Sequence, residues 1–260
     1  MNFKDQINNV FELKKTPKRI ISLVPSQTEL LVDLGLENCI VGVTKFCVHP
    51  KNIRKTTTVV GGTKTIHIDK IKALKPDIIL CNKEENTKEI VEICQKIAPT
   101  HVSDIYTIND SIEVIKQYGA IFSKQKEAQN LVLKLHAILE DFNQFIKNKP
   151  TLKVIYFIWK NPWMIAGNTT FINYLLALNN FKNVYENLPR YPEITIENLK
   201  ESDLILLSSE PYPFKDKHIV EIKKYAKNAK IILVDGEYFS WYGSRLLKAF
   251  DYFKELRKRM

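Results

Sequence analysis

Cys47 and His49 are the pair whose residue types and spacing come nearest to metal chemistry. A thiolate and an imidazole both bind Zn²⁺ and related ions, and residues i and i+2 of an extended segment point to the same side. Two ligands do not complete a site, so another side chain would have to converge on them. The residues that could supply it are His67, Cys81, Glu84 and His101. In the alternative interpretation, Cys47 is a small buried hydrophobe and His49-Pro50 is a loop turn.

Lys64 and Glu84 are charged residues in predicted loops. The run 61–64 (GGTK) only superficially resembles a phosphate-binding loop, because the leading glycine of that motif is missing and no strand closely precedes the run. We therefore interpret Lys64 as a cation at the edge of a binding cleft. Glu84 directly follows a predicted strand, at the end where open α/β sheets bind ligands. Glu85 is interpreted as an acid at a helix N-terminus.

Short apolar runs alternate with helical patterns along the chain, which predicts βα units and parallel sheets. A capping box of Ser26 and Glu29 opens the first helix, and Gly35 lies where its C-cap is expected. The predicted strands are residues 20–24, 40–43, 78–81, 99–102, 152–158, 204–207 and 231–234. Further predicted helices are residues 68–74, 85–97, 170–178 and 246–256.

The middle of the chain differs from these βα units. Asp110 and Glu113 form a second capping box, whose helix is expected to end near residues 122–123. Ser123 then caps a helix that runs to about Asn148, with apolar residues spaced alternately three and four apart. About 25 helical residues span roughly 37 Å. A helix of this length can act as a rigid strut between two lobes.

The two ends of the chain have related patterns. A helical segment that contains an acid, 68–72, precedes the strand at 78, and a similar segment, 196–200, precedes the strand at 204. This suggests two lobes of related topology that face one another, with a ligand in the cleft between them. The predicted divisions are an N-terminal α/β lobe at 1–108, connecting helices at 109–150 and a C-terminal α/β lobe at 151–260.

The composition narrows the class of protein. A chain of 260 residues with 45% hydrophobic and 26% charged residues is typical of a globular protein with two small domains. The net charge of +10 is spread along the chain without a nucleic-acid-binding motif, so we expect no nucleic-acid partner. The four cysteines form no CxxC pair, and no disulfide framework is indicated. We expect a monomer.

The N-terminal residues show no apolar stretch of the kind that a signal peptide needs. No segment is long and apolar enough to span a bilayer either. These observations favour either the cytoplasm or a chain that lacks its export signal.

Three segments carry a recognisable pattern: 17–29 (PKRIISLVPSQTE), 34–44 (LGLENCIVGVT) and 71–79 (IKALKPDII). Their order and spacing resemble the helical-backbone (class III, TroA-like) substrate-binding proteins of ABC importers, nearest to the cobalamin and ferric-siderophore branch. The resemblance runs from about Pro17 to the C-terminus. It implies an α/β fold of two Rossmann-like lobes with parallel sheets, joined by a single long backbone helix. It also implies binding of cobalamin, haem or a ferric siderophore without catalysis, no enzyme cofactor, and delivery to an ABC permease.

In this family, one carboxylate on each lobe docks onto arginines of the membrane permease. The resemblance places Asp69 and Glu197 at the matching positions. Both residues also have a simpler interpretation, because an acid is favoured at any helix N-terminus. The family works in the periplasm or on the outer face of the membrane.

The cobalamin branch of the family holds the corrinoid with aromatic residues from loops of both lobes. The matching loops are 45–50, 161–163 and 237–245. The rings of the last loop can stack on a flat macrocycle, and its arginine can pair with a carboxylate or phosphate; alternatively, these rings pack the C-terminal helix onto its sheet. The predicted ligand-binding residues are Phe46, Cys47, His49, Lys64, Glu84, Trp163, Tyr238, Trp241, Tyr242 and Arg245.

Two other functions remain open on the sequence. The chain has no Gly-x-Ser-x-Gly, His-Glu-x-x-His or dinucleotide-binding glycine motif, which makes an enzyme the less favoured class. A tetrapyrrole-chelatase-like enzyme that uses Cys47 and His49 is suggested by fold analogy alone. A cytoplasmic metal or cofactor carrier derived from the importer family is the third class, and it suits a chain without a signal peptide.

Overall fold

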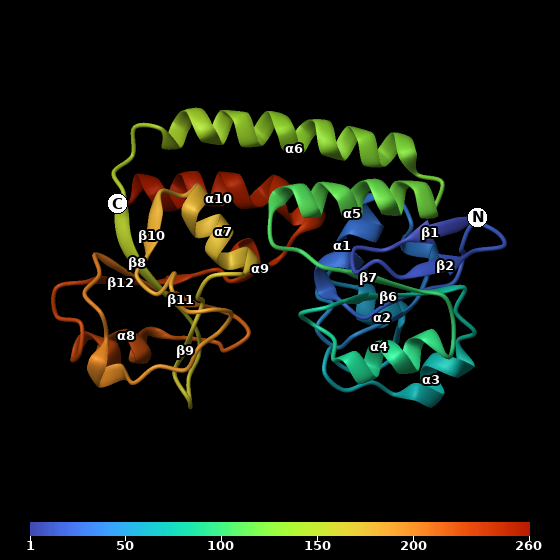
Figure 1. Cartoon of the computed structure of the whole chain (residues 1–260), viewed down its shortest axis with the longest axis horizontal. Coiled ribbons are helices and arrows are strands. Elements are labelled where there is room, and N and C mark those ends of the chain that lie inside the picture. The colour runs from blue at the N-terminus through green and yellow to red at the C-terminus, as the bar shows by residue number, and fades with distance from the viewer. The chain divides into compact units, whose positions relative to one another are not determined.

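The computed structural model describes residues 1–260, and the chain folds into two compact units. Unit 1 consists of residues 1–136 and 242–246, and unit 2 consists of residues 137–241 and 247–260. Each unit is built on its own sheet, in which the main strands are parallel (Figure 1). The predicted fold class, two α/β lobes, is confirmed. The return of residues 242–246 to unit 1 is a feature that no sequence pattern indicates.

Unit 1 contains a five-stranded parallel sheet in the order β5-β4-β3-β6-β7. Its strands are β3 (Ile20–Ser22), β4 (Ile40–Val43), β5 (Thr58–Val59), β6 (Ile78–Asn82) and β7 (Thr100–Ser103). An antiparallel hairpin of β1 (Asn2–Lys4) and β2 (Val10–Glu12) precedes the sheet. The four strands predicted in this part of the chain are confirmed, whereas β1, β2 and β5 are too short to show a periodic pattern.

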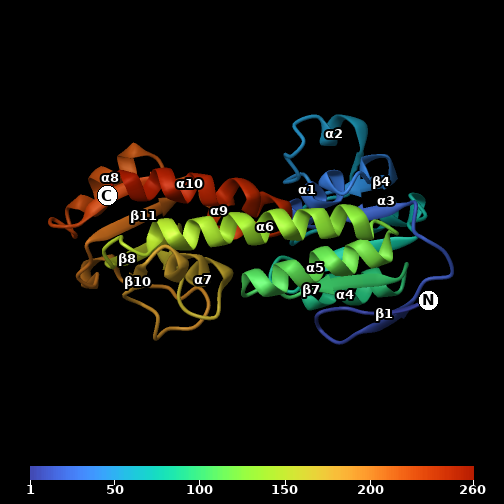
Figure 2. The same ribbon diagram turned by 90° about the horizontal axis from the view of Figure 1, so that it is seen from above.

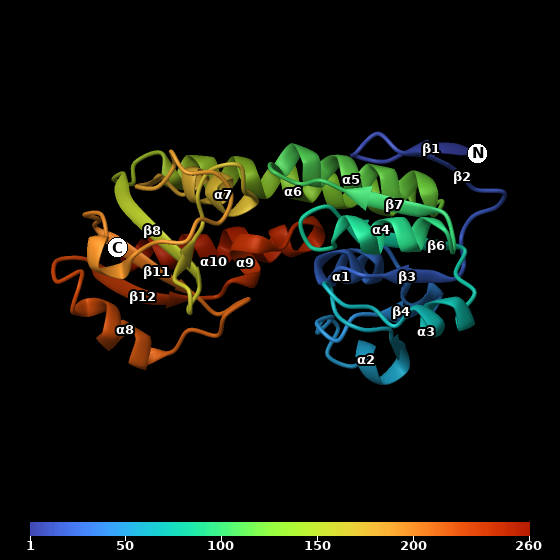
Figure 3. The ribbon, with the colours of Figure 1, turned by 60° about the horizontal axis from the view of Figure 1, so that its bottom comes forward.

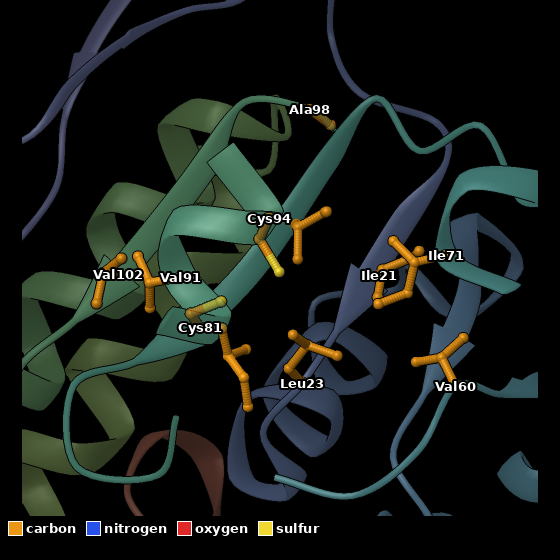
Figure 4. Packing of buried hydrophobic residues seen from close by; sticks show 11 residues of the cluster. Ile21, Leu23, Val60, Ile71, Cys81, Val91, Cys94, Ala98 and Val102 are labelled. Atoms are coloured by element: carbon orange, nitrogen blue, oxygen red, sulfur yellow. The ribbon is translucent and has the colours of Figure 1, made fainter. Parts of the chain in front are cut away.

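Helices cover both faces of this sheet. They are α1 (Pro25–Asp33), α2 (Ile53–Thr56), α3 (Ile68–Ala73), α4 (Lys88–Gln95) and α5 (Ile108–Ile121), with a 3₁₀ turn η1 (Glu37–Cys39). On one face, Ile21 and Cys81 pack with Cys94 of α4 in a buried cluster (Figure 4). On the other face, the ring of His101 in β7 lies 5.2 Å from the ring of Tyr118 in α5. Strands that are buried on both faces explain why the sequence shows continuous apolar runs.

The start of α1 differs from its prediction. The helix begins at Pro25 with Val24 as N-cap, and no side chain caps it, so the predicted box of Ser26 and Glu29 does not form. Proline suits the first helical turn because its missing N–H would have no partner there. The predicted C-terminus is confirmed, since Gly35 adopts a φ of 75° directly after the helix.

The capping box of α5 lies three residues before the predicted one. The Thr107 hydroxyl accepts a hydrogen bond from the Asp110 N–H, and the Asp110 carboxylate accepts one from the Thr107 N–H. Asp110 is therefore the third residue of the helix and not its N-cap. The prediction included the correct aspartate but made it the N-cap residue, whereas it is the acidic N3 residue of the capping box.

Unit 2 repeats the arrangement of unit 1. Its sheet has the order β10-β8-β11-β12 with parallel neighbours, and β9 pairs antiparallel with β8. The strands are β8 (Leu152–Trp159), β9 (Met164–Ile165), β10 (Phe181–Asn183), β11 (Leu204–Ser208) and β12 (Lys230–Val234). This order matches β4-β3-β6-β7 of unit 1 strand for strand, which confirms the predicted relation between the two topologies.

Helices cover both faces of the second sheet as well (Figure 3). The elements are α7 (Phe171–Leu178), η2 (Ile196–Asn198), α8 (Asp216–Lys223), α9 (Glu237–Ser240) and α10 (Leu246–Lys258), and the short η3 (Gly243–Arg245) falls in unit 1. On one face, Ile205 and Leu207 of β11 pack with Ile222 of α8. Tyr156 of β8 points to the other face, where its ring lies 5.1 Å from that of Phe239 in α9.

A single long helix, α6 (Gln125–Ile146), begins in unit 1 and ends in unit 2 (Figure 2). Its 22 residues span about 33 Å. Leu135 and Phe142 of the predicted apolar stripe are completely buried. The predicted connecting helix is thus confirmed, slightly shorter than expected. No helix of the chain combines the length and the apolar character that a membrane span requires.

Candidate functional site

Three loops of unit 1 follow the carboxyl ends of strands in its sheet and contact one another. They are residues 44–50 after β4, residues 60–67 after β5 and residues 83–87 after β6. The backbone N–H of Lys45 donates to the Gly61 carbonyl at 2.7 Å, and Lys64 Nζ donates to the Glu84 carbonyl at 2.7 Å. We call these three loops the unit 1 loop face. Because α/β sheets bind ligands at this edge, it is the candidate site of unit 1.

Phe46 presents an aromatic ring on the unit 1 loop face, with 48% of its surface exposed. Lys45 Nζ lies 5.0 Å from the centroid of that ring, a distance that suits a cation–π interaction. Gly62 packs closely against the ring, because a Cβ at that position would lie 3.2 Å from the nearest ring atom. An exposed ring beside a cation can stack on a flat ligand that carries an anionic group.

Lys64, Glu84 and Glu85 are charged residues of the unit 1 loop face. Burial raises the pKa of the Glu85 carboxyl, and the charge of Glu84 raises it further, while Lys64 and a hydrogen bond from Thr63 act in the opposite direction. Since α4 begins only at Lys88, Glu85 is not the acid of a helix N-terminus, and that interpretation is wrong. Because Glu84 was predicted as a ligand-binding residue, its direct neighbour Glu85 could have been predicted on the same loop.

Cys47 and His49 are not joined by a third side chain of the kind that binds metals. The Cys47 side chain is completely buried, with its Sγ 3.1 Å from Thr28 Oγ1 and 3.3 Å from Thr44 Oγ1. Burial raises the pKa of the thiol, although both threonines lower it in part. Nowhere in the chain do three or more His, Cys, Asp or Glu side chains gather as metal ligands would. The buried thiol fits the alternative interpretation, in which Cys47 is a small buried hydrophobe, and the structure adds no third ligand to the pair on which the metal and chelatase-like hypotheses rest.

The carboxyl edge of the unit 2 sheet also carries aromatic rings. Trp159 ends β8 with 38% of its surface exposed, and its ring lies edge-on to Tyr212 with 5.6 Å between centroids. The predicted residue Trp163 is half-buried, stacks on Phe214 at 6.2 Å and has Lys160 Nζ 5.1 Å from its ring. Trp159 was not among the predicted residues. A tryptophan directly after the predicted strand 152–158 is the signal that could have found it.

Tyr238 and Trp241 pack within unit 2. The ring of Tyr238 stacks on Tyr252 of α10 with 4.7 Å between centroids. The indole N–H of Trp241 donates to Glu210 Oε1 at 2.9 Å, and the side chain is only 7% exposed. The Tyr238 contact supports the alternative interpretation, in which this aromatic segment packs the C-terminal helix onto its sheet, whereas Trp241 is bonded to the loop after β11.

Tyr242 and Arg245 lie inside unit 1. The Tyr242 hydroxyl is 2.9 Å from both Gln27 Nε2 and Ser103 Oγ, and burial raises the pKa of the phenol to about 12. Arg245 Nε donates to Glu29 Oε2 at 2.8 Å, and both side chains are buried. The expectation that this guanidinium pairs with a ligand anion is wrong, because the structure gives it an internal carboxylate.

Asp69 and Glu197 occupy equivalent positions in the two topologies. Asp69 lies in the first turn of α3, which leads into β6, and Glu197 lies in the first turn of η2, which leads into β11. The strands β6 and β11 match one another in the two sheet orders. Both carboxylates are exposed. This placement is compatible with a docking role, which stays a prediction.

Two hollows of the surface lie away from the predicted ligand-binding residues. One of about 580 Å³ is lined by polar residues of the N-terminal hairpin region and of α5 in unit 1. The other, of about 200 Å³, lies between β12 and α10 in unit 2. Neither is lined by a predicted ligand-binding residue, so the candidate site remains the unit 1 loop face.

Residues 20–230 match the model of the family described as periplasmic binding protein. An uncharacterised ABC transporter substrate-binding lipoprotein of Bacillus subtilis is 28% identical over 201 residues, which cover 74% of this chain and 63% of that protein. A vitamin B12-binding protein of Pectobacterium carotovorum is 24% identical over 249 residues, which cover 90% of this chain and 86% of that protein.

The fold is also shared with solved structures. The crystal structure of a periplasmic heme-binding protein from Pseudomonas aeruginosa superposes with a TM-score of 0.81 over 93% of this chain and 92% of that one, at 19% identity. At this identity the likeness shows the two-lobed fold with its long connecting helix. The family match over most of its length establishes that the chain belongs to the periplasmic binding protein family.

Proposed function

We propose that this protein binds a metal chelate without transforming it and delivers the chelate to the permease of an ABC importer. Membership of the periplasmic binding protein family supports a binding function. Relatives named for vitamin B12 and heme support a macrocyclic chelate as the ligand class. The observation that carries the proposal is the exposed ring of Phe46 with Lys45 and Lys64 on the same loop face.

The chemistry of the loops favours a flat ligand with anionic groups at its rim. Aromatic rings stack on the face of a macrocycle, and lysine ammonium groups attract carboxylates or phosphates. Phe46 and Lys45 supply this combination in unit 1, and Lys160 lies beside the half-buried ring of Trp163 in unit 2. We therefore place cobalamin, which carries a phosphate, and haem, which carries two carboxylates, ahead of a ferric siderophore.

Native mass spectrometry with cyanocobalamin, haemin and a ferric hydroxamate tests the ligand class. We expect a one-to-one adduct with one of the two macrocycles. An adduct with the hydroxamate alone would overturn the preference for a macrocycle. Absence of any adduct, with the protein shown to be folded by circular dichroism, would refute the chelate-binding proposal.

Phe46→Ala tests whether the unit 1 loop face is the binding surface. Loss of one stacked ring removes about 0.5–1.5 kcal/mol of aromatic contact in addition to its buried area, so we expect the Kd to rise by roughly tenfold or more. The matched control is Leu133→Ala, which trims another exposed apolar side chain, 59% exposed on α6. Equal affinities of both variants would remove the loop face from the site.

The proposed site of permease docking is the pair of exposed carboxylates Asp69 and Glu197. The double variant Asp69→Arg, Glu197→Arg should lose co-purification with the permease while its ligand affinity is retained. The control variant Glu37→Arg, Glu140→Arg makes the same charge change on one exposed carboxylate of each unit. If the control variant loses co-purification to the same extent, the effect is one of net charge, and the docking role is refuted. Such docking requires a location on the outer face of the membrane.

A further inference from the structure

The C-terminal part of the chain inserts one short segment, Tyr242–Leu246, into unit 1. Gly243 makes the turn possible, because it adopts a φ of 76° and its N–H donates to Ser111 Oγ at 2.8 Å. Tyr242 is 5% exposed. Although Tyr242 comes late in the sequence, its side chain is part of the interior of unit 1.

The Tyr242 hydroxyl joins a buried polar network at the carboxyl ends of β6 and β7. Ser103 Oγ, the last side chain of β7, lies 2.9 Å from the Tyr242 hydroxyl and 2.7 Å from Gln27 Nε2. Asn82 Nδ2, at the end of β6, donates to the same Ser103 oxygen at 2.9 Å. Ser103 therefore connects the inserted tyrosine to Asn82 through a single atom.

Asn82 in turn fixes the loop that carries Glu84. Its Oδ1 accepts hydrogen bonds from the backbone N–H groups of Glu84 at 2.9 Å and Glu85 at 3.0 Å. Its own backbone N–H donates to Asn86 Oδ1 at 2.9 Å, and Asn86 Nδ2 donates to the Thr63 carbonyl at 2.9 Å. The orientation of the Asn82 amide thus sets the backbone of residues 83–87 and ties it to the neighbouring loop of the unit 1 loop face.

We propose that Tyr242 is a positioning residue: through Ser103 and Asn82 it orients the Glu84–Glu85 segment of the unit 1 loop face for the ligand. This inference rests on the proposed function, which makes the loop face a binding surface. The inserted segment thus contributes to ligand binding indirectly, through the loop that it positions. Buried polar networks of this kind specify one geometry, because each member loses its partner when another moves.

Tyr242→Phe is the direct test, because it removes only the hydroxyl. We expect amide hydrogen exchange of Glu84 and Glu85 to accelerate roughly three- to tenfold, the range that corresponds to loss of one buried neutral hydrogen bond. The matched control is Tyr118→Phe, since the Tyr118 hydroxyl is buried in the same unit and has no hydrogen-bond partner. Exchange at Glu84 and Glu85 should be unchanged in that control.

Ser103→Ala provides a second route to the same result and covers the case in which the tyrosine variant folds poorly. If both residues act through one path, the double variant Tyr242→Phe, Ser103→Ala should accelerate exchange no more than Ser103→Ala alone. Acceleration spread evenly over all amides of unit 1, or none at Glu84 and Glu85, would overturn the positioning role.

Affinity separates this inference from the proposed function. With whichever of cyanocobalamin or haemin binds the wild type, Tyr242→Phe should raise the Kd by the same three- to tenfold factor. Faster exchange with an unchanged Kd would overturn the link to the ligand, while chelate binding itself would stand. If neither macrocycle binds the wild type, the macrocycle ligand class fails, and the exchange data still decide whether Tyr242 positions the loop.

Discussion

We expect Glu29→Gln to destabilise unit 1 strongly. The side chains of Arg245 and Glu29 are 5% and 7% exposed, and Arg245 Nε lies 2.8 Å from Glu29 Oε2. Glutamine keeps the size of the side chain but removes its charge, so the guanidinium loses the carboxylate with which it pairs. Removal of one partner from a buried ion pair costs about 3–5 kcal/mol. That is a large part of the roughly 5–15 kcal/mol by which a native protein is stable.

Urea unfolding at neutral pH, followed by far-ultraviolet circular dichroism, measures this loss. With a slope near 2 kcal/mol per molar urea, a loss of about 4 kcal/mol lowers the midpoint of unit 1 by roughly 2 M. Tryptophan fluorescence reports unit 2 separately, because Trp159, Trp163 and Trp241 all belong to it. A midpoint of unit 1 equal to that of the wild type would refute the reasoning.

Two controls test whether the loss of stability comes from an unpaired charge in the interior. The double variant Glu29→Met, Arg245→Met leaves no unpaired charge in the interior, so it should be more stable than Glu29→Gln despite its larger chemical change. The exposed pair of Glu255 and Lys258 provides the comparison at the surface. Glu255→Gln should leave the midpoint unchanged, because solvent screens such pairs.

Three further predictions concern buried titratable groups. Without denaturant, iodoacetamide should alkylate Cys39 and spare the three buried cysteines, whereas mass spectrometry should count four adducts in urea; four adducts in the native protein would contradict the burial. Glu85→Gln should stabilise the protein at pH 7 but not at pH 4. Burial raises the pKa of Glu85, so the folded protein is less stable once this carboxyl loses its proton, and glutamine cannot ionise. An equal gain in stability at both pH values would argue against this cause. Burial lowers the pKa of His101, so as the pH falls the histidine is protonated in the unfolded chain before it is protonated in the folded protein. The urea midpoint should therefore fall as the pH drops below about 6.5. His101→Gln should weaken this pH dependence of the midpoint, and a dependence as steep as that of the wild type would assign it to another group.

Local patterns were enough to predict the longer strands and helices of the two units, whereas short elements such as β5, β10 and α8 were missed. The strand at 40–43 was predicted with its final bounds, and the long helix α6 followed from apolar residues spaced three and four apart. Both signals arise from neighbours in sequence, which explains why they can be read without the fold. The capping boxes failed because Ser, Thr, Asp and Glu fit the motif in more than one register.

The candidate site was predictable only where residues lie in loops that directly follow strands. Glu84 was predicted from its place directly after a strand, and Phe46 from a loop that matches the family resemblance. Lys64 was predicted as a cation at the cleft edge although no strand was predicted before it. All three belong to the unit 1 loop face. Tyr242 and Arg245 were assigned to the ligand because an aromatic ring and a guanidinium in a loop have the same sequence signature whether they face a ligand or the interior. Exposure decides between these roles, and exposure is a property of the folded chain.

The sequence by itself determined the alternation of strands and helices, the long connecting helix and the family to which the chain belongs. The tertiary structure alone decided which side chains are partners: Arg245 meets Glu29 across 216 positions of sequence, and Tyr242 meets Ser103 across 139. Backbone preferences act over a few residues, so periodicity reveals them. The pairing of buried polar groups is instead set by which strand ends and helices the fold brings together, because each group must find a partner wherever it becomes buried.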